Sequence, residues 1–160
     1  MAEKKSKPSV CFVCLGNICR SPTAEAIFRA LAEEQGIAHQ IFIDSAGTAR
    51  EHAGEAPDPR SAAAALKRGV TLAGYSRQFN GDDFARFSWI VAMDAKNLRD
   101  IKKVTGAENY KGRLCLLRDF DPKRPGDVPD PYIAGSESFD AVFDVCDRSC
   151  RELLKAVMGG

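Results

Sequence analysis

The stretch Val10 to Pro22 has the sequence VCFVCLGNICRSP, and it decides the fold. Its first four residues form an apolar run typical of a buried strand, and Pro22 suits the first turn of a helix. Apolar residues then recur at helical spacing, at Ala24, Ile27, Phe28 and Leu31. The stretch therefore predicts a strand, a tight loop and an amphipathic helix in succession.

The loop between these two elements, Cys14 to Arg20, is predicted to bind an anion. Backbone N–H groups converge where a helix begins, and both they and the helix dipole favour negative charge. Arg20 can add a planar pair of donors for two phosphate oxygens. The same surroundings favour a thiolate, so Cys14 is expected to be a nucleophile without a histidine base. The alternatives are an ordinary buried cysteine and a helix-capping arginine, and the shared context of the two residues favours the anion site.

The composition limits the class of protein. A chain of 160 residues fits one compact domain, and we expect a disordered segment over residues 1–8 followed by one domain over residues 9–158. The net charge of +1, with both signs interspersed, gives no broad field for binding nucleic acid or a membrane surface. The chain has no signal-peptide pattern and no apolar stretch long enough for a bilayer. With six cysteines and no leader, we expect reduced thiols, a cytoplasmic location and no nucleic-acid or membrane partner.

Strand-like runs alternate with helical patterns along the chain. Strands are expected at Val10–Cys14, Ile41–Asp44, Trp89–Met93 and Leu114–Leu117. Helices are expected at Pro22–Gln35, Arg60–Arg68, Lys96–Val104 and Phe139–Val157, the second and third capped by Asp58 and Asp94. Arg118–Ile133 has neither period and is expected to be a long loop. The pattern predicts a single-domain α/β fold with a doubly wound four-stranded parallel sheet, helices on both faces and a ligand site at the strands' carboxyl ends.

The string from Cys14 to Pro22, CLGNICRSP, resembles the Cys-x5-Arg-Ser signature of the low-molecular-weight protein tyrosine phosphatases. A second motif of that family, Asp130-Pro131-Tyr132, lies near the C-terminus, and the resemblance runs from about Val10 to Leu154. It implies a flavodoxin-like fold and hydrolysis of phosphotyrosine through a cysteinyl-phosphate. The implied substrates are tyrosine-phosphorylated proteins or small aryl phosphates, with no metal or other cofactor. We expect a monomer, with a weak dimer as the alternative.

In that mechanism Cys14 attacks phosphorus in line, while Arg20 and loop amides hold the equatorial oxygens. The amides are those of Leu15, Gly16, Asn17, Ile18 and Cys19. Asp130 is the candidate general acid, which protonates the departing phenolate and then, as a carboxylate, activates water. An aspartate before proline is by itself an ordinary turn former, and only the Cys14 motif favours the catalytic role. His39, expected at an exposed junction, and His52, expected in a loop, rank below it.

Other residues are expected to support or line this loop. Asn17, Ser21 and Ser45 are assigned to support, since asparagine tolerates left-handed backbone geometry and hydroxyls can hold a loop. The resemblance makes Tyr132 one wall of the substrate slot, where an aryl ring would lie against it. On the opposite lip the family often has an aromatic residue where this chain has Glu51. An acidic lip should disfavour peptides with acidic neighbours.

The chain departs from the family pattern at two further places. Ile133 stands where the family often has a second tyrosine, and Gly74 stands where it often has a supporting histidine. The resemblance also makes Cys19 a redox partner, which forms a disulfide with an exposed Cys14 thiolate under oxidation. The other four cysteines are expected in the core, and no Cys-x2-Cys pair suggests zinc. They are Cys11, Cys115, Cys146 and Cys150.

Three other functions stay open from the sequence. A thiol-dependent arsenate reductase shares the fold and first motif but needs further cysteines near residues 80–90, and Gly81–Ile90 contains none. A protein-arginine phosphatase also resembles this chain, but that branch tends to carry threonine in place of Ile18. A non-catalytic phosphotyrosine-binding module would be expected to lose Cys14 or Asp130, and both are present.

Overall fold

The loop that begins at Cys14 follows an inner strand of the sheet. The structure, a computed structural model, describes residues 7–131 and 137–159, so most of the segment expected to be disordered lies outside it. Four parallel strands are ordered β2-β1-β3-β4. They are β1 (Ser9–Cys14), β2 (Phe42–Gly47), β3 (Trp89–Ala92) and β4 (Arg113–Leu116). The order reverses between β1 and β3, which places the end of β1 where ligands bind in such sheets.

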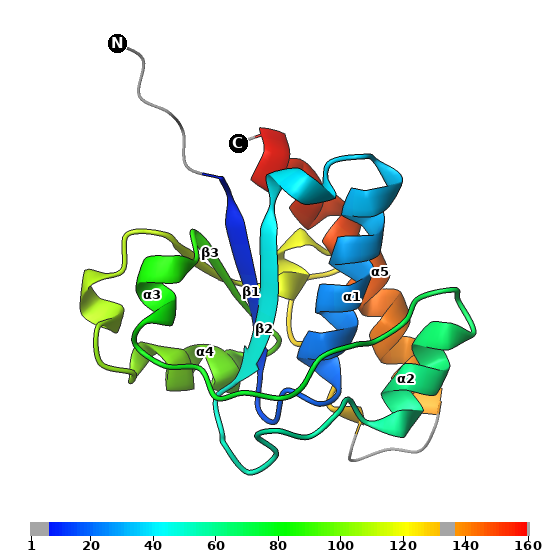
Figure 1. Cartoon of the computed structure of the whole chain (residues 1–160), viewed down its shortest axis with the longest axis horizontal. Helices are drawn as coiled ribbons and strands as arrows, with labels where there is room; N and C mark the ends of the chain where they lie inside the picture. The colour runs from blue at the N-terminus through cyan, green and yellow to red at the C-terminus, as the bar shows by residue number, and fades with distance from the viewer. Residues whose placement is uncertain (1–6, 132–136, 160) are drawn as a thin grey trace.

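Helices cover both faces of the sheet, which confirms the predicted doubly wound architecture. The α-helices are α1 (Arg20–Glu34), α2 (Pro59–Leu66), α3 (Asp83–Arg86), α4 (Ala95–Lys102) and α5 (Glu137–Gly159). Short 3-10 turns are η1 (Ala38–Gln40), η2 (Ala107–Asn109) and η3 (Leu117–Phe120). In Figure 1, α1, α2 and α5 lie on one side of the sheet, and α3 and α4 lie on the other. None of the helices in the described part of the chain is long and apolar enough to cross a membrane.

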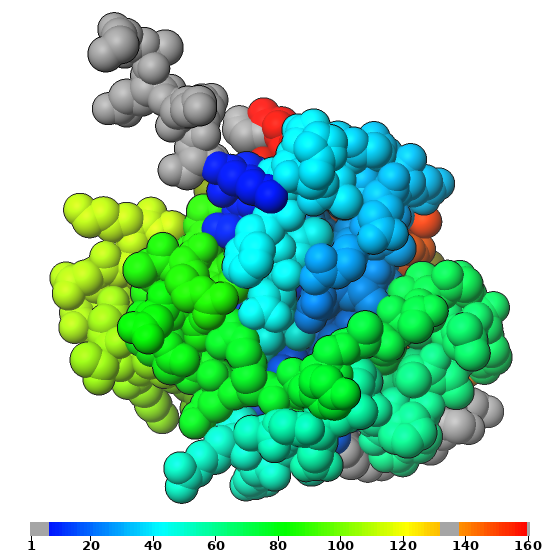
Figure 2. All heavy atoms as spheres, viewed as in Figure 1, coloured from blue at the N-terminus to red at the C-terminus, as the bar shows by residue number. Residues whose placement is uncertain are grey.

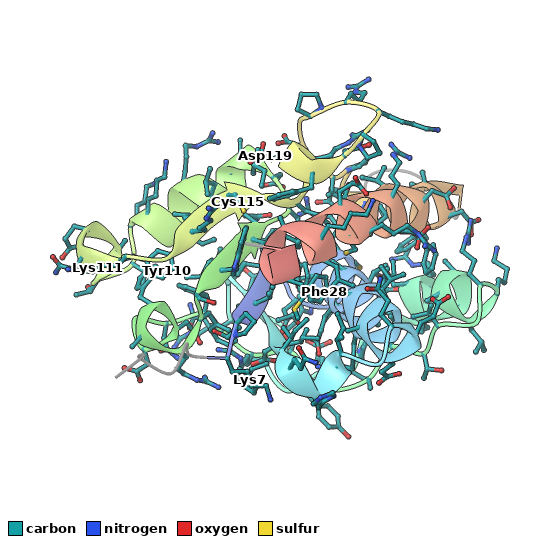
Figure 3. All side chains as sticks on the ribbon, turned by 90° about the horizontal axis from the view of Figure 1, so that it is seen from above. Lys7, Phe28, Tyr110, Lys111, Cys115 and Asp119 are labelled. Carbon is teal, nitrogen blue, oxygen red and sulfur yellow. The ribbon has the colours of Figure 1, made fainter. Side chains whose placement is uncertain are left out.

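Two cores form because successive strand side chains point to opposite faces. Along β1, Val10 and Phe12 pack toward α1 and α5, while Cys11 and Val13 pack toward the other helical layer. Phe12 meets Phe28 of α1 edge to face, with ring centroids 5.4 Å apart. Figure 3, seen from above, labels Phe28 within this layer. Both faces of the central strand are therefore closed, and only its carboxyl end is left for a ligand.

The two predicted helix caps are confirmed. Asp58 accepts a hydrogen bond from the backbone N–H of Arg60 at 2.8 Å, and α2 begins at the next residue, a proline. Asp94 accepts from the backbone N–H of Asn97 at 2.7 Å, and the Asn97 side chain accepts from the N–H of Asp94 in return. Such caps satisfy donors that the first helical turn leaves unpaired, and they fix where each helix begins.

The expected loop Arg118–Ile133 was wrong in its first three residues, because the 3-10 turn η3 occupies Leu117–Phe120. Asp119 accepts from the backbone N–H of Leu116 at 3.0 Å and so closes a turn too short to show a period in the sequence. The placement of Cys115 in the core was also inexact, since it is only partly buried on the edge strand β4. Cys11, Cys146 and Cys150 are buried as expected.

Candidate active site

The loop from Cys14 to Arg20 connects the end of β1 to the start of α1. A cavity of about 250 Å3 opens over it. Its lining residues are Cys14, Leu15, Gly16, Ile18, Cys19, Arg20, Ala49, Glu51, His52 and Asp130. In Figure 2 the segment that follows β2, coloured cyan to green, forms the lower edge of the molecule. Residues from three distant parts of the chain therefore share one cavity at the carboxyl ends of the strands.

The sulfur of Cys14 lies at the base of this loop. It accepts a hydrogen bond from the backbone N–H of Asn17 at 3.2 Å and lies 3.0 Å from Oγ of Ser21. Asn17 has φ of 57°, a left-handed conformation that turns its N–H toward the sulfur. The expectation that Cys14 is exposed was wrong, because it is only 3% exposed. It ends a central strand, so neighbouring strands and the loop cover it, and only the cavity reaches it.

The three predicted support residues are brought together around the Asn17 side chain. Its Nδ2 donates to Oγ of Ser21 at 2.8 Å and to Oγ of Ser45 at 3.0 Å. Ser45 in turn donates to Oε1 of Glu25 at 2.5 Å. Glu25 lies on α1 and Ser45 on β2, so the chain of bonds joins the loop to both flanking elements. Asn17 thereby connects the surroundings of the Cys14 sulfur to the sheet.

Two more supports of the loop were missed by the sequence analysis. Ser76 donates from Oγ to the carbonyl of Gly16 at 2.8 Å, and the backbone N–H of Arg77 donates to Oδ1 of Asn17 at 3.1 Å. Both come from the segment before α3. Gly74, also in that segment, lines a small cavity of about 70 Å3 together with Asn17. No local signal marks these residues, because their contacts join segments about sixty residues apart.

Arg20 is buried beside an acidic partner. It is 4% exposed, and its Nη1 donates to Oδ2 of Asp94 at 2.6 Å and to the carbonyl of Val128 at 3.2 Å. Burial opposes its charge, but the Cys14 and Asp94 groups raise the pKa of the Arg20 guanidinium. The pairing with Asp94 was not predicted. The available signal was its place directly after β3, because parallel strands end at the same edge of the sheet.

Asp130, which belongs to the segment after η3, lines the cavity together with Glu51 and His52. Nδ1 of His52 lies 2.8 Å from Oε2 of Glu55, so a carboxylate already engages this ring. His39 is exposed in η1, away from the cavity, as expected. The cavity thus joins Asp130 to Cys14 and Arg20. Tyr132 and Ile133 lie outside the described residues.

Cys19 borders the same cavity as Cys14 and is 5% exposed. Burial raises the pKa of the Cys19 thiol to about 12, against a hydrogen bond with Ser61 that lowers it. Cys19 is therefore a neutral thiol at physiological pH. Within residues 7–131 and 137–159, no cluster of three histidine, cysteine, aspartate or glutamate side chains has the arrangement of a metal site.

This arrangement suits an attack by sulfur on a bound oxyanion. A sulfur atom at the base of the loop accepts a hydrogen bond from a loop amide, and a guanidinium and a carboxyl group line the same cavity. Amides and a guanidinium bind phosphoryl oxygens, and a carboxyl group can give a proton to a leaving oxygen. The residues that line this cavity therefore have the chemistry to bind a phosphoryl group.

Comparisons with known proteins point the same way. The family model described as low molecular weight phosphotyrosine protein phosphatase matches residues 9–159. A low molecular weight phosphotyrosine protein phosphatase of Sus scrofa is 41% identical over 158 residues, 98% of this chain and 99% of the relative. The crystal structure of a protein tyrosine phosphatase from Entamoeba histolytica has a TM-score of 0.88 at 34% identity, covering 95% of this chain and 98% of that one. A Drosophila arginine phosphatase structure has a TM-score of 0.83 at 30% identity, covering 92% and 96%.

Proposed function

The chain belongs to the low molecular weight phosphotyrosine protein phosphatase family, and on that premise we propose that Cys14 is its nucleophile and Asp130 its general acid. The protein is a phosphatase, a hydrolase whose substrates are phosphorylated proteins or small aryl phosphates. One observation carries the assignment of roles. The Cys14 sulfur, the Arg20 guanidinium and the Asp130 carboxyl group border a single cavity.

In the first step, the Cys14 thiolate attacks phosphorus from the side opposite the aryl oxygen. The S–P bond forms as the P–O bond to the ring breaks, and Asp130 gives its proton to the departing phenolate. In the second step, water attacks the phosphoryl group on sulfur and passes a proton to the Asp130 carboxylate. The S–P bond then breaks, and the enzyme returns to its starting state with inorganic phosphate released.

Arg20 is assigned to two phosphoryl oxygens. Its Nη1 is held by Asp94 and by the carbonyl of Val128. Among the described residues its Nε and Nη2 have no hydrogen-bond partner, so this planar pair of donors is available for the phosphoryl oxygens. Asp94 thus orients the fork before the substrate arrives. Amides of Leu15 to Arg20 supply the remaining donors.

Ser21 is assigned to the departing sulfur of the second step. Its Oγ lies 3.0 Å from the sulfur and accepts a hydrogen bond from Asn17. Because Nδ2 of Asn17 donates to this oxygen, the hydroxyl proton points to another acceptor, either the carbonyl of Ala46 at 3.5 Å or the Cys14 sulfur, and a thiolate at 3.0 Å is the nearer of the two. A donor aimed at developing negative charge lowers the barrier to its formation.

Phosphotyrosine is the substrate class that we propose. Ile18 and Leu15 give the cavity apolar walls, which suit an aryl ring better than a guanidinium. Arginine phosphatase activity is the second candidate, supported by the similarity to the Drosophila enzyme. Measuring kcat/KM on a phosphotyrosine peptide and on a phosphoarginine peptide under the same conditions distinguishes the two activities. We expect the phosphotyrosine peptide to be preferred.

We also propose that the protein is a cytoplasmic monomer that does not bind nucleic acid. All six cysteines are free, which is typical of reducing compartments. The net charge of +1 gives no field for a nucleic acid. Sedimentation at several protein concentrations tests the oligomeric state, and a stable dimer at low concentration would contradict it.

Hydrolysis of p-nitrophenyl phosphate by the wild type and by Cys14→Ser tests the proposed function. Serine keeps the loop amides and Arg20 but lacks an ionised nucleophile near neutral pH. The variant should therefore lose turnover and still bind phosphate or vanadate. Turnover by Cys14→Ser at the wild-type rate would rule out the covalent mechanism.

A further inference from the structure

A buried ion cluster lies in the segment that leads to Asp130. The Asp121 side chain is fully buried and accepts from Nε of Arg118 and from Nε of Arg148, each at 2.8 Å. The backbone N–H of Lys123 also donates to it at 2.8 Å. Arg118 belongs to η3 and Arg148 to α5, and Figure 3 shows η3, marked by Asp119, beside α5. The cluster therefore fastens the start of this segment to a long, rigid helix.

Arg118 has a second contact that reaches further along the segment. Its Nη1 donates to the backbone carbonyl of Asp127 at 2.9 Å. The Asp127 side chain accepts from the backbone N–H of Ala95 at 3.0 Å, and the N–H of Val128 donates to the carbonyl of Met93 at 2.8 Å. Residues 127 and 128 are thus held in place from several sides, only a short distance along the chain before Asp130.

The main effect of such an ion cluster is to fix the position of the backbone segment that it holds. A buried ion pair often adds little net stability, because removing both charges from water offsets much of their attraction. Directional donors, however, fix positions where the backbone has no helix or strand, as is the case between η3 and Asp130. A general acid depends on such precision, since a misplacement of about 1 Å can cost roughly 10²-fold in rate.

We propose that Arg118 is a positioning residue for Asp130, and that Asp121 and Arg148 lock Arg118 against α5. The inference rests on the proposed function, because it takes Asp130 as the general acid. Without the Arg118 guanidinium, the carbonyl of Asp127 loses its hydrogen bond. The Asp130 carboxyl group can then move away from the leaving oxygen of the substrate. The Arg20–Asp94 pair does not involve Arg118, and Val128, whose carbonyl also holds Arg20, keeps its own hydrogen bond to Met93, so phosphate binding is retained.

The test compares kcat/KM for phenyl phosphate, a poor leaving group, with that for p-nitrophenyl phosphate, whose leaving group departs readily without a proton. Arg118→Met keeps an unbranched side chain and removes the fork. We expect it to lower kcat/KM about tenfold or more for phenyl phosphate and less than about threefold for p-nitrophenyl phosphate, since acid catalysis contributes about 10²–10⁴. Vanadate inhibition should be unchanged. Equal losses on both substrates would show a structural role and overturn the proposal.

Two arginines of α5, Arg148 and Arg151, supply a second test and a control. Arg148→Met removes a side chain that is 23% exposed, so it tests the cluster even if Arg118→Met fails to fold. It should show the same dependence on leaving group, and Arg148→Lys, which keeps a donor for Asp121, should restore most of the loss. Arg151→Met is the matched control, because Arg151 pairs with Asp147 on the exposed side of the same helix. It should behave as the wild type.

Combining Arg118→Met with Asp130→Ala shows whether the arginine acts through the acid. If it does, Arg118→Met adds no further loss once Asp130 is absent. Losses that multiply would contradict the inference and leave the phosphatase mechanism standing. If Asp130→Ala itself affected both leaving groups equally, the assignment of Asp130 as the acid would fail instead, which distinguishes the two outcomes.

Discussion

The Arg20 guanidinium has two roles, and different nitrogen atoms carry them: one holds the side chain in place, and the others are proposed to bind phosphate. Nη1 bonds Asp94 and the carbonyl of Val128, and the proposed phosphate contact uses the rest of the fork. A lysine has one compact charge and cannot do both. We predict that Arg20→Lys lowers kcat/KM for p-nitrophenyl phosphate by about 10²-fold or more and weakens vanadate binding in parallel. Steady-state kinetics with vanadate inhibition measures this.

Arg151→Lys is the matched control for that change, because its partner Asp147 lies on the surface. It should keep wild-type kinetics. If Arg20→Lys retained activity within a few-fold of the wild type, the guanidinium would have no part in phosphate binding.

At Cys19, a neutral thiol that lines the same cavity as Cys14 suits a protective role. Peroxide converts the Cys14 thiolate to sulfenic acid, and attack by the Cys19 sulfur then forms a disulfide and releases water. Since burial raises the pKa of Cys19 to about 12, Cys14 should be the sulfur that oxidises first. We predict that Cys19→Ser keeps the activity of the reduced enzyme but recovers less with dithiothreitol after peroxide.

Mass spectrometry after mild peroxide treatment is the direct measurement. The wild type should show a crosslink between Cys14 and Cys19, and the variant should show sulfinic acid on Cys14. Equal recovery of the two proteins, with no crosslink in the wild type, would remove the redox role and leave the catalytic assignment intact.

On the scale of single elements, the loop between β1 and α1 depends on Asn17. Its left-handed φ of 57° is readily adopted by glycine and strained for alanine. Both Asn17→Gly and Asn17→Ala remove the bonds to Ser21 and Ser45. We predict that both variants lose activity, and that the alanine variant is less stable than the glycine variant by about 1 kcal/mol. Urea unfolding measures the difference, and a more stable alanine variant would contradict the strained backbone.

The sequence allowed most of the elements to be predicted, because their signals are local. Apolar runs marked the strands, and Asp58 and Asp94 marked two helix starts correctly. The start of α1 was placed at Pro22 but lies at Arg20, since Cys19 is not a usual capping residue and gives no signal there. The helix α3 was missed because its four residues are too few to show a period.

The predictable part of the site was likewise the local part. Cys14 and Arg20 lie on one strand–loop–helix unit, and Asp130 was found through a motif. The partners Asp94 and Arg77 meet the loop only through space, so spacing along the chain carries little information about them. For the same reason the burial of Cys14 became visible only in the folded sheet.

On the scale of the whole molecule, Asp121 couples stability to pH. Burial would raise the pKa of Asp121, but hydrogen bonds from Arg148 and Arg118 outweigh burial and hold the pKa well below its ordinary value. A carboxyl group with a lowered pKa in the folded state stabilises the fold above its unfolded pKa, about 3.9, and loses that contribution as the pH falls further. The ion cluster should therefore stabilise the protein near neutrality and weaken in acid.

We predict that Asp121→Asn lowers the free energy of unfolding by roughly 2–3 kcal/mol at pH 7, because it leaves two arginines poorly paired. The difference from the wild type should shrink below about pH 4, because Asp121 of the unfolded wild type is then protonated while the folded carboxylate, with its lowered pKa, is not, and this proton uptake favours unfolding. Urea unfolding at several pH values measures this. Asp100→Asn, which breaks an exposed pair with Lys96, is the control and should change little. A difference that stays constant from pH 7 to pH 3 would contradict the linkage.

The central claim is that the phosphoryl group is bound covalently to the Cys14 sulfur during the reaction. Trapping this intermediate tests the claim most directly. Asp130→Ala slows the hydrolytic step, while p-nitrophenyl phosphate still transfers its phosphoryl group because nitrophenolate departs without a proton. The quenched enzyme is digested and its peptides are analysed by mass spectrometry. The account predicts one added phosphoryl group on the peptide that holds Cys14, and none in Cys14→Ser. Continued turnover with that peptide unmodified, or a phosphoryl group on another residue, would contradict it.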